Sequence, residues 1–349
     1  MKEVSKILTQ RNIILVSPLP PPIGGIASWT ESFVNYCNKN DIPCTVVNSS
    51  VAEKRANSSK VSYLEEWKRL RRIRSELRQA VRQQKDCVIH YNASCFTAGL
   101  IRDYLVLKGI NTPVVYQCHC NLDTNLNNKI ASFMFQKVCN TVKTVCVLNS
   151  ASRQTASLYH KNVKYIPNFI DELYREVADA NGKIKNVCFV GRVCTSKGIL
   201  EYIEAGKART DLQFHIVGPI EDSISSLCDT DNFKIWGAQP HEKVIEILKE
   251  MDVYVLPSYT EGFPLGVLEA MSCGLPVIAT DVGSISDMIE NQGGILIPQK
   301  SSDAIVSALN EMDSSDVRQK MAEFNIAKVR NEYLIEKVIA QLRETYDSF

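Results

Sequence analysis

Two glutamates spaced to bind hydroxyl groups lie in the segment Val253–Asp281. An apolar run ends before Pro257, and Pro264 opens a predicted helix, where proline is well tolerated because its missing amide hydrogen has no partner there. Glu261 lies in the predicted loop, and Glu269 lies about one turn into the helix. A carboxylate accepts hydrogen bonds from two neighbouring hydroxyls, which ribose and hexoses both offer. We therefore interpret this pair as a site for a ligand with vicinal hydroxyls.

The same turn offers backbone donors. The first amides of the predicted helix, at residues 265–267, have no partner within the helix and should point out of its end, where they attract the oxygen atoms of an anion. The plainer interpretation treats Glu261 as a loop charge and Glu269 as the partner of a nearby lysine. The surrounding prolines and glycines favour the ligand site.

Two cations follow another predicted strand, in the segment Phe189–Gly198. Arg192 comes directly after the strand, which ends at Gly191, and Lys197 precedes the next predicted helix. A cation at a helix N-terminus is unfavourable unless an anion lies nearby. We interpret the two side chains as ligands of a diphosphate, and the alternative is a pair of solvated surface cations.

The first half of the chain holds weaker candidates. Gly24 and Gly25 follow the first predicted strand and would let backbone approach a ligand, although an ordinary turn has the same pattern. No G-x-G-x-x-G fingerprint is present, which disfavours a dehydrogenase. His119 follows a strand and is expected at the edge of the sheet where ligands bind, with a structural histidine as the alternative. His90, placed at the end of another predicted strand, ranks below it.

The surrounding elements alternate between short β-branched runs and helical stretches, which predicts parallel sheets covered on both faces. Predicted strands are Ile13–Ser17, Thr45–Asn48, Cys87–Tyr91, Val114–Gln117, Thr144–Leu148, Val187–Val190, Gln213–Val217, Phe233–Trp236, Val253–Leu256, Val277–Ala279 and Ile295–Ile297. Predicted helices are 28–39, 61–84, 96–108, 127–139, 151–160, 197–209, 241–250, 266–272, 284–290, 302–312 and a broken 316–346.

This order of elements predicts an α/β protein of two Rossmann-like, doubly wound domains that face each other across a cleft. The polar stretch 172–185 is typical of a linker. We expect an N-terminal domain over 1–168, a second domain over 169–330, and a C-terminal helix over 331–349 that crosses back to the first domain.

Composition excludes several classes of protein. The formal net charge of +1 over 349 residues argues against a nucleic-acid partner. None of the 12 cysteines forms a CxxC pair. In Cys118-His119-Cys120, the alternation of a strand places His119 on the face opposite the two thiols, so the three side chains cannot bind one ion. We therefore predict no metal site. Met1–Gln10 lacks a secretory signal, and prolines interrupt the uncharged residues 12–30, so we expect a cytoplasmic protein.

A basic stretch runs from Lys60 to Lys85, with nine cations against three anions. Leu64, Trp67, Leu70, Leu77 and Val81 recur in it at helical spacing. A basic amphipathic helix with a tryptophan can lie on an anionic membrane, which would place the protein peripherally on the inner face of the plasma membrane. The alternative is a solvated helix whose apolar stripe packs on the sheet.

Taken together, these motifs resemble the family 4 glycosyltransferases of the GT-B fold, bacterial-type enzymes of cell-surface polysaccharide and glycolipid synthesis. The matching segments are GGIA after the first strand, His119 after VVYQC, IPNFID at the domain junction, FVGR with SKG, and EGFPLGVLEAMSCGLPVIATDVG. The match is strongest from Asn186 to Pro298. The chain departs from the family at Asn168-Phe169, where many members have Asn-Gly, and this leaves the path of the interdomain crossing open.

The resemblance implies a nucleotide sugar bound by the second domain without a divalent metal or other cofactor. Glu269 would hold the ribose, and Arg192 and Lys197 the diphosphate. His119 would reach the transferred sugar from the other domain. The remaining implied donor contacts are Glu261 with the backbone of Phe263, Pro264, Leu265 and Gly266 for the sugar and α-phosphate, Gly25 and Gly191 near the phosphates, and the backbone of Trp236 and Gly237 for the base.

The implied reaction is transfer of a hexose-type sugar, with retention, from a nucleotide-diphosphate donor to a glycan or polyprenyl-linked acceptor. We favour uridine over guanosine as the base. One alternative is a sugar-nucleotide epimerase of the same fold. Another is a non-catalytic pseudo-transferase that binds the nucleotide alone.

Overall fold

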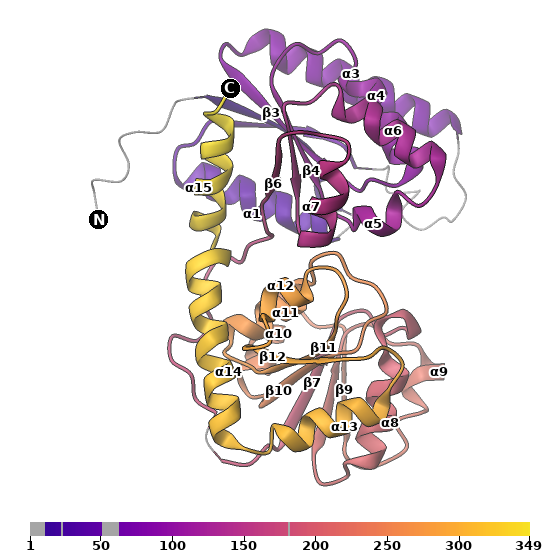
Figure 1. Ribbon diagram of the computed structural model, residues 1–349, viewed down its shortest axis with the longest axis vertical. Helices are drawn as coiled ribbons and strands as arrows, with labels where there is room; N and C mark the ends of the chain where they lie inside the picture. The colour runs from indigo at the N-terminus through magenta and orange to yellow at the C-terminus, as the bar shows by residue number, and fades with distance from the viewer. Residues whose placement is uncertain (1–10, 22–23, 51–62, 181) are drawn as a thin grey trace. The chain divides into compact units, whose positions relative to one another are not determined.

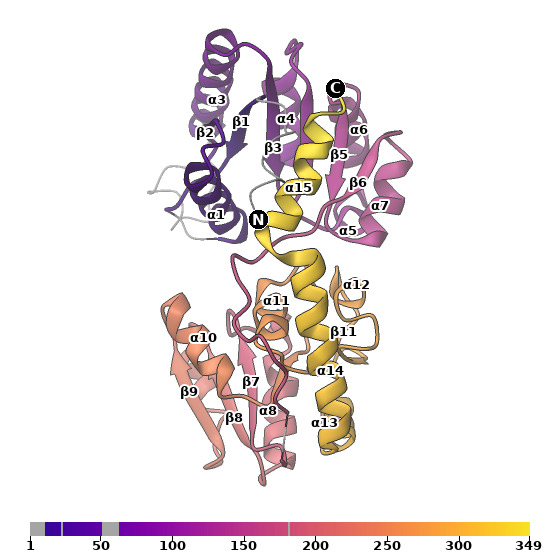
Figure 2. The same ribbon diagram turned by 90° about the vertical axis from the view of Figure 1, so that its left-hand side faces the viewer.

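The computed structural model describes residues 11–21, 24–50, 63–180 and 182–349, and the chain divides into two units. Unit 1 comprises Met1–Asn168 with Ile335–Phe349, and unit 2 comprises Phe169–Leu334. Each unit contains a six-stranded parallel sheet with helices on both faces (Figures 1 and 2). The predicted α/β fold of two doubly wound units is confirmed.

In unit 1 the strand order is β2-β1-β3-β4-β5-β6. Its central strands are almost continuously apolar because helices cover both of their faces. The strands are β1 (Asn12–Ser17), β2 (Cys44–Asn48), β3 (Cys87–Ala93), β4 (Val114–Cys118), β5 (Thr144–Val147) and β6 (Val163–Tyr165).

The helices of unit 1 divide between the faces of this sheet. Within β3, Tyr91 donates to Asp103 of α4, whereas the neighbouring His90 bonds to Tyr346 of α15. Successive strand residues point to opposite faces, so α4 and α15 lie on different sides. The helices are α1 (Gly25–Lys39), α3 (Tyr63–Gln83), α4 (Thr97–Leu107), α5 (Leu122–Asn125), α6 (Lys129–Cys139), α7 (Ser150–Ser157) and α15 (Ile335–Tyr346).

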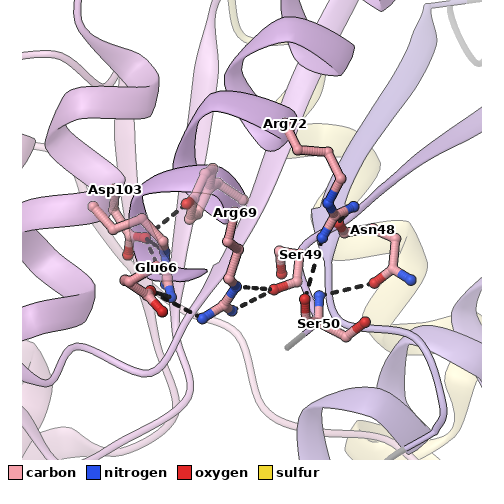
Figure 3. A network of polar contacts seen from close by, with 9 residues as sticks. Asn48, Ser49, Ser50, Glu66, Arg69, Arg72 and Asp103 are labelled. Carbon is pink, nitrogen blue, oxygen red and sulfur yellow. Dashed lines mark hydrogen bonds and ion pairs between the residues drawn. The ribbon is translucent and has the colours of Figure 1, made fainter. Parts of the chain in front are cut away.

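Helix α3 is tied to the sheet by its own arginines. Arg69 donates from Nε to the Ser49 carbonyl at 2.8 Å, and Arg72 donates to the Asn48 carbonyl at 2.8 Å (Figure 3). These carbonyls stand at the end of β2, where the ladder no longer satisfies them. Part of the basic stretch is therefore structural. Lys60, predicted to begin that stretch, lies outside the described residues.

In unit 2 the strand order is β12-β11-β10-β7-β8-β9. The strands are β7 (Asn186–Val190), β8 (Gln213–Val217), β9 (Phe233–Gly237), β10 (Val253–Leu256), β11 (Val277–Thr280) and β12 (Gly294–Ile297). The helices are η2 (Thr195–Lys197), α8 (Ile199–Ala208), α9 (Asp222–Ser225), α10 (His241–Lys249), α11 (Leu265–Ser272), α12 (Ile285–Ile289), α13 (Ser302–Glu311), α14 (Ser315–Lys328) and the π-helical η3 (Val329–Tyr333).

Each sheet has a point where the direction of strand addition reverses. In unit 2 the chain runs outward from β7 through β8 to β9, then returns to the other side of β7 with β10. The turns that follow β7 and β10 therefore diverge from adjacent strand ends, where doubly wound sheets bind ligands. In unit 1 the corresponding pair is β1 and β3.

The predicted elements match the observed ones closely, and the predicted final helix is broken at Leu334, which is extended (φ −67°, ψ 143°). Three short elements lie outside the predictions, namely β6, α5 and α9. Each has only three or four residues, too few for a periodic pattern to show.

Candidate functional site

The candidate site of unit 2 is built from the turns after β7 and β10. The amide of Tyr259 donates to the Ser196 carbonyl at 2.9 Å, which joins the two turns. Gly198 has a φ of +70°, and a Cβ at this position would lie 2.0 Å from the Pro257 carbonyl oxygen. Only glycine allows this approach, so it fixes Lys197 beside the turn that carries Glu261.

The structure brings Lys197 and Glu261 into direct contact, with Nζ and Oε1 2.5 Å apart. The Glu261 side chain is only 8% exposed. The Ser258 hydroxyl donates to the same carboxylate oxygen at 2.7 Å. An ammonium has three donor hydrogens, so Lys197 can hold this carboxylate and still bind a ligand oxygen.

Glu269 lies on α11 and contacts a residue that the sequence analysis missed. Its Oε1 is 3.1 Å from Nε2 of His241, in the first turn of α10. This hydrogen bond raises the pKa of His241 because the carboxylate stabilises the imidazolium. The sequence could have indicated His241, because it begins the helix that follows β9 and so lies at the same edge of the sheet.

Arg192 is exposed just after β7. Within the described ranges it forms no hydrogen bond or ion pair. Its position in the turn beside Lys197 leaves the guanidinium available to a ligand.

The N-terminus of α11 corrects one prediction. The amide of Val267 donates to the Pro264 carbonyl at 3.1 Å, so the predicted set of free donors at residues 265–267 was wrong for its third member. The amides of Leu265 and Gly266 remain at the helix end. A Cβ at Gly266 would lie 2.6 Å from Oη of Tyr254, which itself donates to the Val190 carbonyl. Glycine here lets α11 start close to the end of β7.

Two aromatic residues of the predicted site are held by unit 2 itself. The Phe263 ring is buried and packs edge-on against Tyr333, 5.7 Å away, so only its backbone can meet a ligand. Trp236 donates from Nε1 to Nδ1 of His215 at 3.2 Å. Gly237 ends β9 with a φ of +65°. The contact of a base with the backbone of residues 236 and 237 stays a prediction.

The predicted residues of unit 1 lie at the carboxyl edge of its sheet. Gly25 begins α1 and is exposed, and a Cβ there would meet nothing within 4 Å. His119 directly follows β4, and its Nε2 is 2.9 Å from Oδ1 of Asn92. Burial lowers the pKa of His119 to about 3. His90 lies inside β3 rather than at its end, because this strand extends to Ala93.

Among the described residues, no group of three or more His, Cys, Asp or Glu side chains is arranged to hold a metal ion. Asp229 and Asp231 have the Asp-x-Asp spacing of some metal-dependent transferases. They precede β9, at the edge of the sheet opposite the candidate site, and Asp229 pairs with Lys207 at 3.2 Å.

A protein-family model described as "Glycosyl transferases group 1" matches residues 171–328, which lie within unit 2 and contain both turns. Unit 2 is a glycosyltransferase group 1 domain. The matched residues, 171–328, are 158 of the 349 in the chain, and they confirm the predicted family for unit 2.

Three relatives show how far the likeness extends. A putative teichuronic acid biosynthesis glycosyltransferase of Bacillus subtilis is 32% identical over 37% of this chain and 33% of its own length. The alpha-D-kanosaminyltransferase of Streptomyces kanamyceticus is 24% identical over 70% of this chain and 73% of its own. An N,N'-diacetylbacillosaminyl-diphospho-undecaprenol alpha-1,3-N-acetylgalactosaminyltransferase of Campylobacter jejuni is 30% identical over 37% and 36%. The first and third matches thus span about a third of those glycosyltransferases.

Solved glycosyltransferase structures share the fold over nearly the whole chain. Sucrose-phosphate synthase of Thermosynechococcus elongatus has a TM-score of 0.75 at 16% identity, covering 97% of this chain and 98% of that one. HepE of Anabaena, in complex with UDP, has a TM-score of 0.72 at 17% identity, covering 97% and 100%. In the described part of the chain, no helix is long and apolar enough to cross a membrane.

Proposed function

We propose that this protein is a retaining glycosyltransferase that moves a hexose-type sugar from a nucleotide-diphosphate donor to a glycan or lipid-linked acceptor. The observation that carries the proposal is the pairing of Lys197 with a nearly buried Glu261 at the reversal point of unit 2. The turns that hold this pair also carry Arg192 and Glu269, which gives one strand edge both cations for a diphosphate and carboxylates for hydroxyls.

The chemistry of sugar transfer uses such groups well. Cleavage of the sugar–diphosphate bond develops negative charge on the leaving phosphate. Fixed donors aimed at that charge stabilise the transition state more than the ground state. Arg192, Lys197 and the two amides at the start of α11 are the donors that we assign to this role. Glu269 accepts from the ribose, and Glu261 accepts from the sugar.

The remaining assignments rest on the family resemblance. His119 contacts the transferred sugar, Gly25 and Gly191 lie near the phosphates, and the base meets the backbone of Trp236 and Gly237. The complex of HepE with UDP supports uridine as the base. We propose that the reaction needs no metal or other cofactor, so that EDTA leaves the rate of transfer unchanged and a strict need for added metal contradicts the assignment.

A lipid-linked acceptor is supported by the surface of unit 1. The Campylobacter relative acts, by its name, on a diphospho-undecaprenol substrate. Large exposed apolar side chains stand at the starts of the neighbouring helices α3, α4 and α6, with exposed fractions between 54% and 62%: Leu64, Trp67, Phe96, Ile130 and Phe133. Helix starts in such a unit lie at the carboxyl edge of the sheet. We propose that this apolar edge meets an acceptor lipid.

The basic helix α3 supports peripheral membrane binding. Its inner stripe, including Leu77, is buried in unit 1, whereas Arg71, Arg78 and Arg82 are exposed on the outside. The buried stripe agrees with the interpretation of a helix packed on the sheet, and the exposed arginines leave the outer face available for the membrane interpretation. We propose that the outer face binds anionic lipid headgroups at the inner side of the plasma membrane.

A panel of nucleotide sugars tests the donor assignment. A donor that binds the folded protein raises its melting temperature. We expect uridine diphosphate sugars to do so, and Glu269→Gln to remove the shift while the matched exposed variant Glu246→Gln keeps it.

Release of nucleotide that depends on an acceptor identifies a transferase. Release without an acceptor indicates an epimerase, and binding without release indicates a pseudo-transferase. Either result contradicts the proposal.

A further inference from the structure

A network of polar side chains, most of them buried, crosses the reversal point of unit 1. It joins Ser17 at the end of β1, Asn92 and His90 of β3, and His119 after β4. It ends at Tyr346 of α15, whose Oη is 2.7 Å from Nδ1 of His90. Ser17, His90, Asn92 and Tyr346 are all at most 4% exposed. Because solvent does not reach these groups, they must form their hydrogen bonds with one another.

The direction of each hydrogen bond in this network follows from the bond that Thr30 makes at one end of it. The Thr30 hydroxyl donates to the Ile26 carbonyl at 2.7 Å, which uses its only proton. Ser17 must therefore donate to Thr30, across 2.5 Å. Ser17 in turn accepts from Nδ2 of Asn92 at 3.0 Å. This fixes the orientation of the Asn92 amide, and its carbonyl oxygen faces the two histidines.

The amide orientation decides the form of both imidazoles. Oδ1 of Asn92 lies 3.0 Å from Nε2 of His90 and 2.9 Å from Nε2 of His119. A carbonyl oxygen only accepts, so both Nε2 atoms carry hydrogen. Burial lowers the pKa of His90 to about 4 and that of His119 to about 3, so both rings are neutral near pH 7. Nδ1 of His90 then accepts from the Tyr346 hydroxyl.

His119 is left with a bare Nδ1, and its ring is held edge-on against Trp29 at 5.6 Å between centroids. We infer that Asn92 and Tyr346 are positioning residues that hold His119 as the neutral Nε2–H tautomer and present Nδ1 as an acceptor for a substrate hydroxyl. The inference rests on the proposed function for the role of His119. The tautomer itself follows from the contacts within unit 1.

The last helix thereby takes part in the site of unit 1. Tyr346 and His90 are 256 residues apart in the chain. The backbone of Tyr346 is held as well, since Arg11 donates to its carbonyl at 3.1 Å. Tyr346 donates to Nδ1 of His90 and so reinforces the Nε2–H form that Asn92 imposes, and His90 shares the Asn92 oxygen with His119. A segment distant from β4 in sequence thus supports the network that orients the histidine after this strand.

The test reads the tautomer directly, from the imidazole ¹⁵N shifts of the full-length protein labelled at histidine, with each signal assigned by its His→Gln variant. We expect His119 to stay in the Nε2–H form from about pH 5 to 8. An Nδ1–H form, or protonation within this range, overturns the inference. This measurement needs no activity, so it stands or fails separately from the proposed function.

Asn92→Asp is the informative substitution. A carboxylate beside both rings favours the imidazolium, so His119 should become protonated at neutral pH and lose its free acceptor. We expect the kcat of transfer to fall by about tenfold or more, with the Kd of the nucleotide within about twofold of the parent. Protonated His119 with unchanged kcat overturns the assigned role.

Tyr346→Phe serves where the Asn92 variant does not fold. It removes the donor to His90 and should give mixed tautomers at His90, with a loss of kcat of about threefold. The matched control is Tyr91→Phe, which removes a hydroxyl from the other face of β3, where Tyr91 donates to Asp103 at 2.6 Å. A single unchanged tautomer in Tyr346→Phe, or an equal change in Tyr91→Phe, overturns the inference.

Discussion

At the residue scale, the ion pair of Lys197 and Glu261 contributes to stability and also belongs to the candidate site of unit 2. The carboxylate is nearly buried, and it accepts from the Lys197 ammonium and from the Ser258 hydroxyl. A buried carboxylate that loses its cation carries an uncompensated charge. We propose that the same ammonium also meets a phosphate.

We therefore predict that Lys197→Ala lowers the free energy of unfolding by about 1 to 2 kcal/mol and transfer by at least about tenfold. Adding Glu261→Gln removes the buried charge and should restore most of the stability but none of the activity. Urea unfolding and initial rates measure the two effects. The exposed pair of Lys243 and Glu246 supplies the control, and a double variant that recovers transfer would contradict the phosphate role.

The lowered pKa values of His90 and His119 predict how stability depends on pH. The pKa values of His90 and His119 are lowered by burial to about 4 and about 3, against about 6.5 in an unfolded chain. Below pH 6.5 the unfolded state binds more protons than the folded state. The free energy of unfolding should have its full value above about pH 6.5. It should decrease by on the order of 2 kcal/mol per histidine as the pH falls toward 4. Urea titrations at several pH values test this. A slope unaltered by His119→Gln would disagree.

At the element scale, α3 carries structural arginines on one face and exposed arginines on another. Arg69 and Arg72 cap the end of β2 (Figure 3), and Arg102 of α4 donates to the buried Asp103 at 2.7 Å. Burial among these groups lowers the pKa of Arg69 to about 10. Arg78 and Arg82, exposed on the outer face, form no hydrogen bond or ion pair among the described residues, and we propose that they bind the membrane surface.

This division predicts different outcomes for two arginine variants of one helix. Arg69→Ala should lower the free energy of unfolding by about 1 to 3 kcal/mol because the Ser49 carbonyl loses its donors. Arg78→Ala should leave stability unchanged and weaken binding to anionic liposomes by about fivefold, from the loss of about 1 kcal/mol per charge. Sedimentation at physiological salt measures binding. Failure of the parent protein to sediment would contradict the membrane proposal.

On the scale of the whole molecule, the last helix belongs to unit 1 although it follows unit 2 in sequence. Its apolar face, including Val338, Ile339 and Leu342, is buried. The stability of unit 1 therefore depends on the final 15 residues, Ile335–Phe349.

Deletion of residues 335–349 should lower the melting transition of unit 1, whereas nucleotide should still stabilise unit 2. Calorimetry with and without a uridine diphosphate sugar separates the two transitions. Full-length Tyr346→Phe, which keeps the helix, should melt close to the parent. Loss of nucleotide binding in the truncated chain would show that unit 2 depends on the helix.

Local patterns were sufficient to predict most elements and the position of the candidate site. The alternation of apolar runs with helical stretches predicted the parallel sheets, and Pro264 with its neighbouring glycines marked the turn after β10. The prediction for the amide of Val267 was wrong because its acceptor depends on how tightly the first turn of α11 closes. The pattern also did not predict the exact end of β3, so His90 was expected at the end of the strand and not inside it.

By itself, the sequence determined the α/β class, the succession of strands and the two motif-bearing turns, because periodicity and turn residues act over a few positions. Only the tertiary structure decided that Lys197 meets Glu261, that His241 meets Glu269, and that Tyr346 reaches His90. These partners lie 64, 28 and 256 residues apart. Contacts over such separations depend on strand order and on which face a helix covers, and no local pattern encodes either.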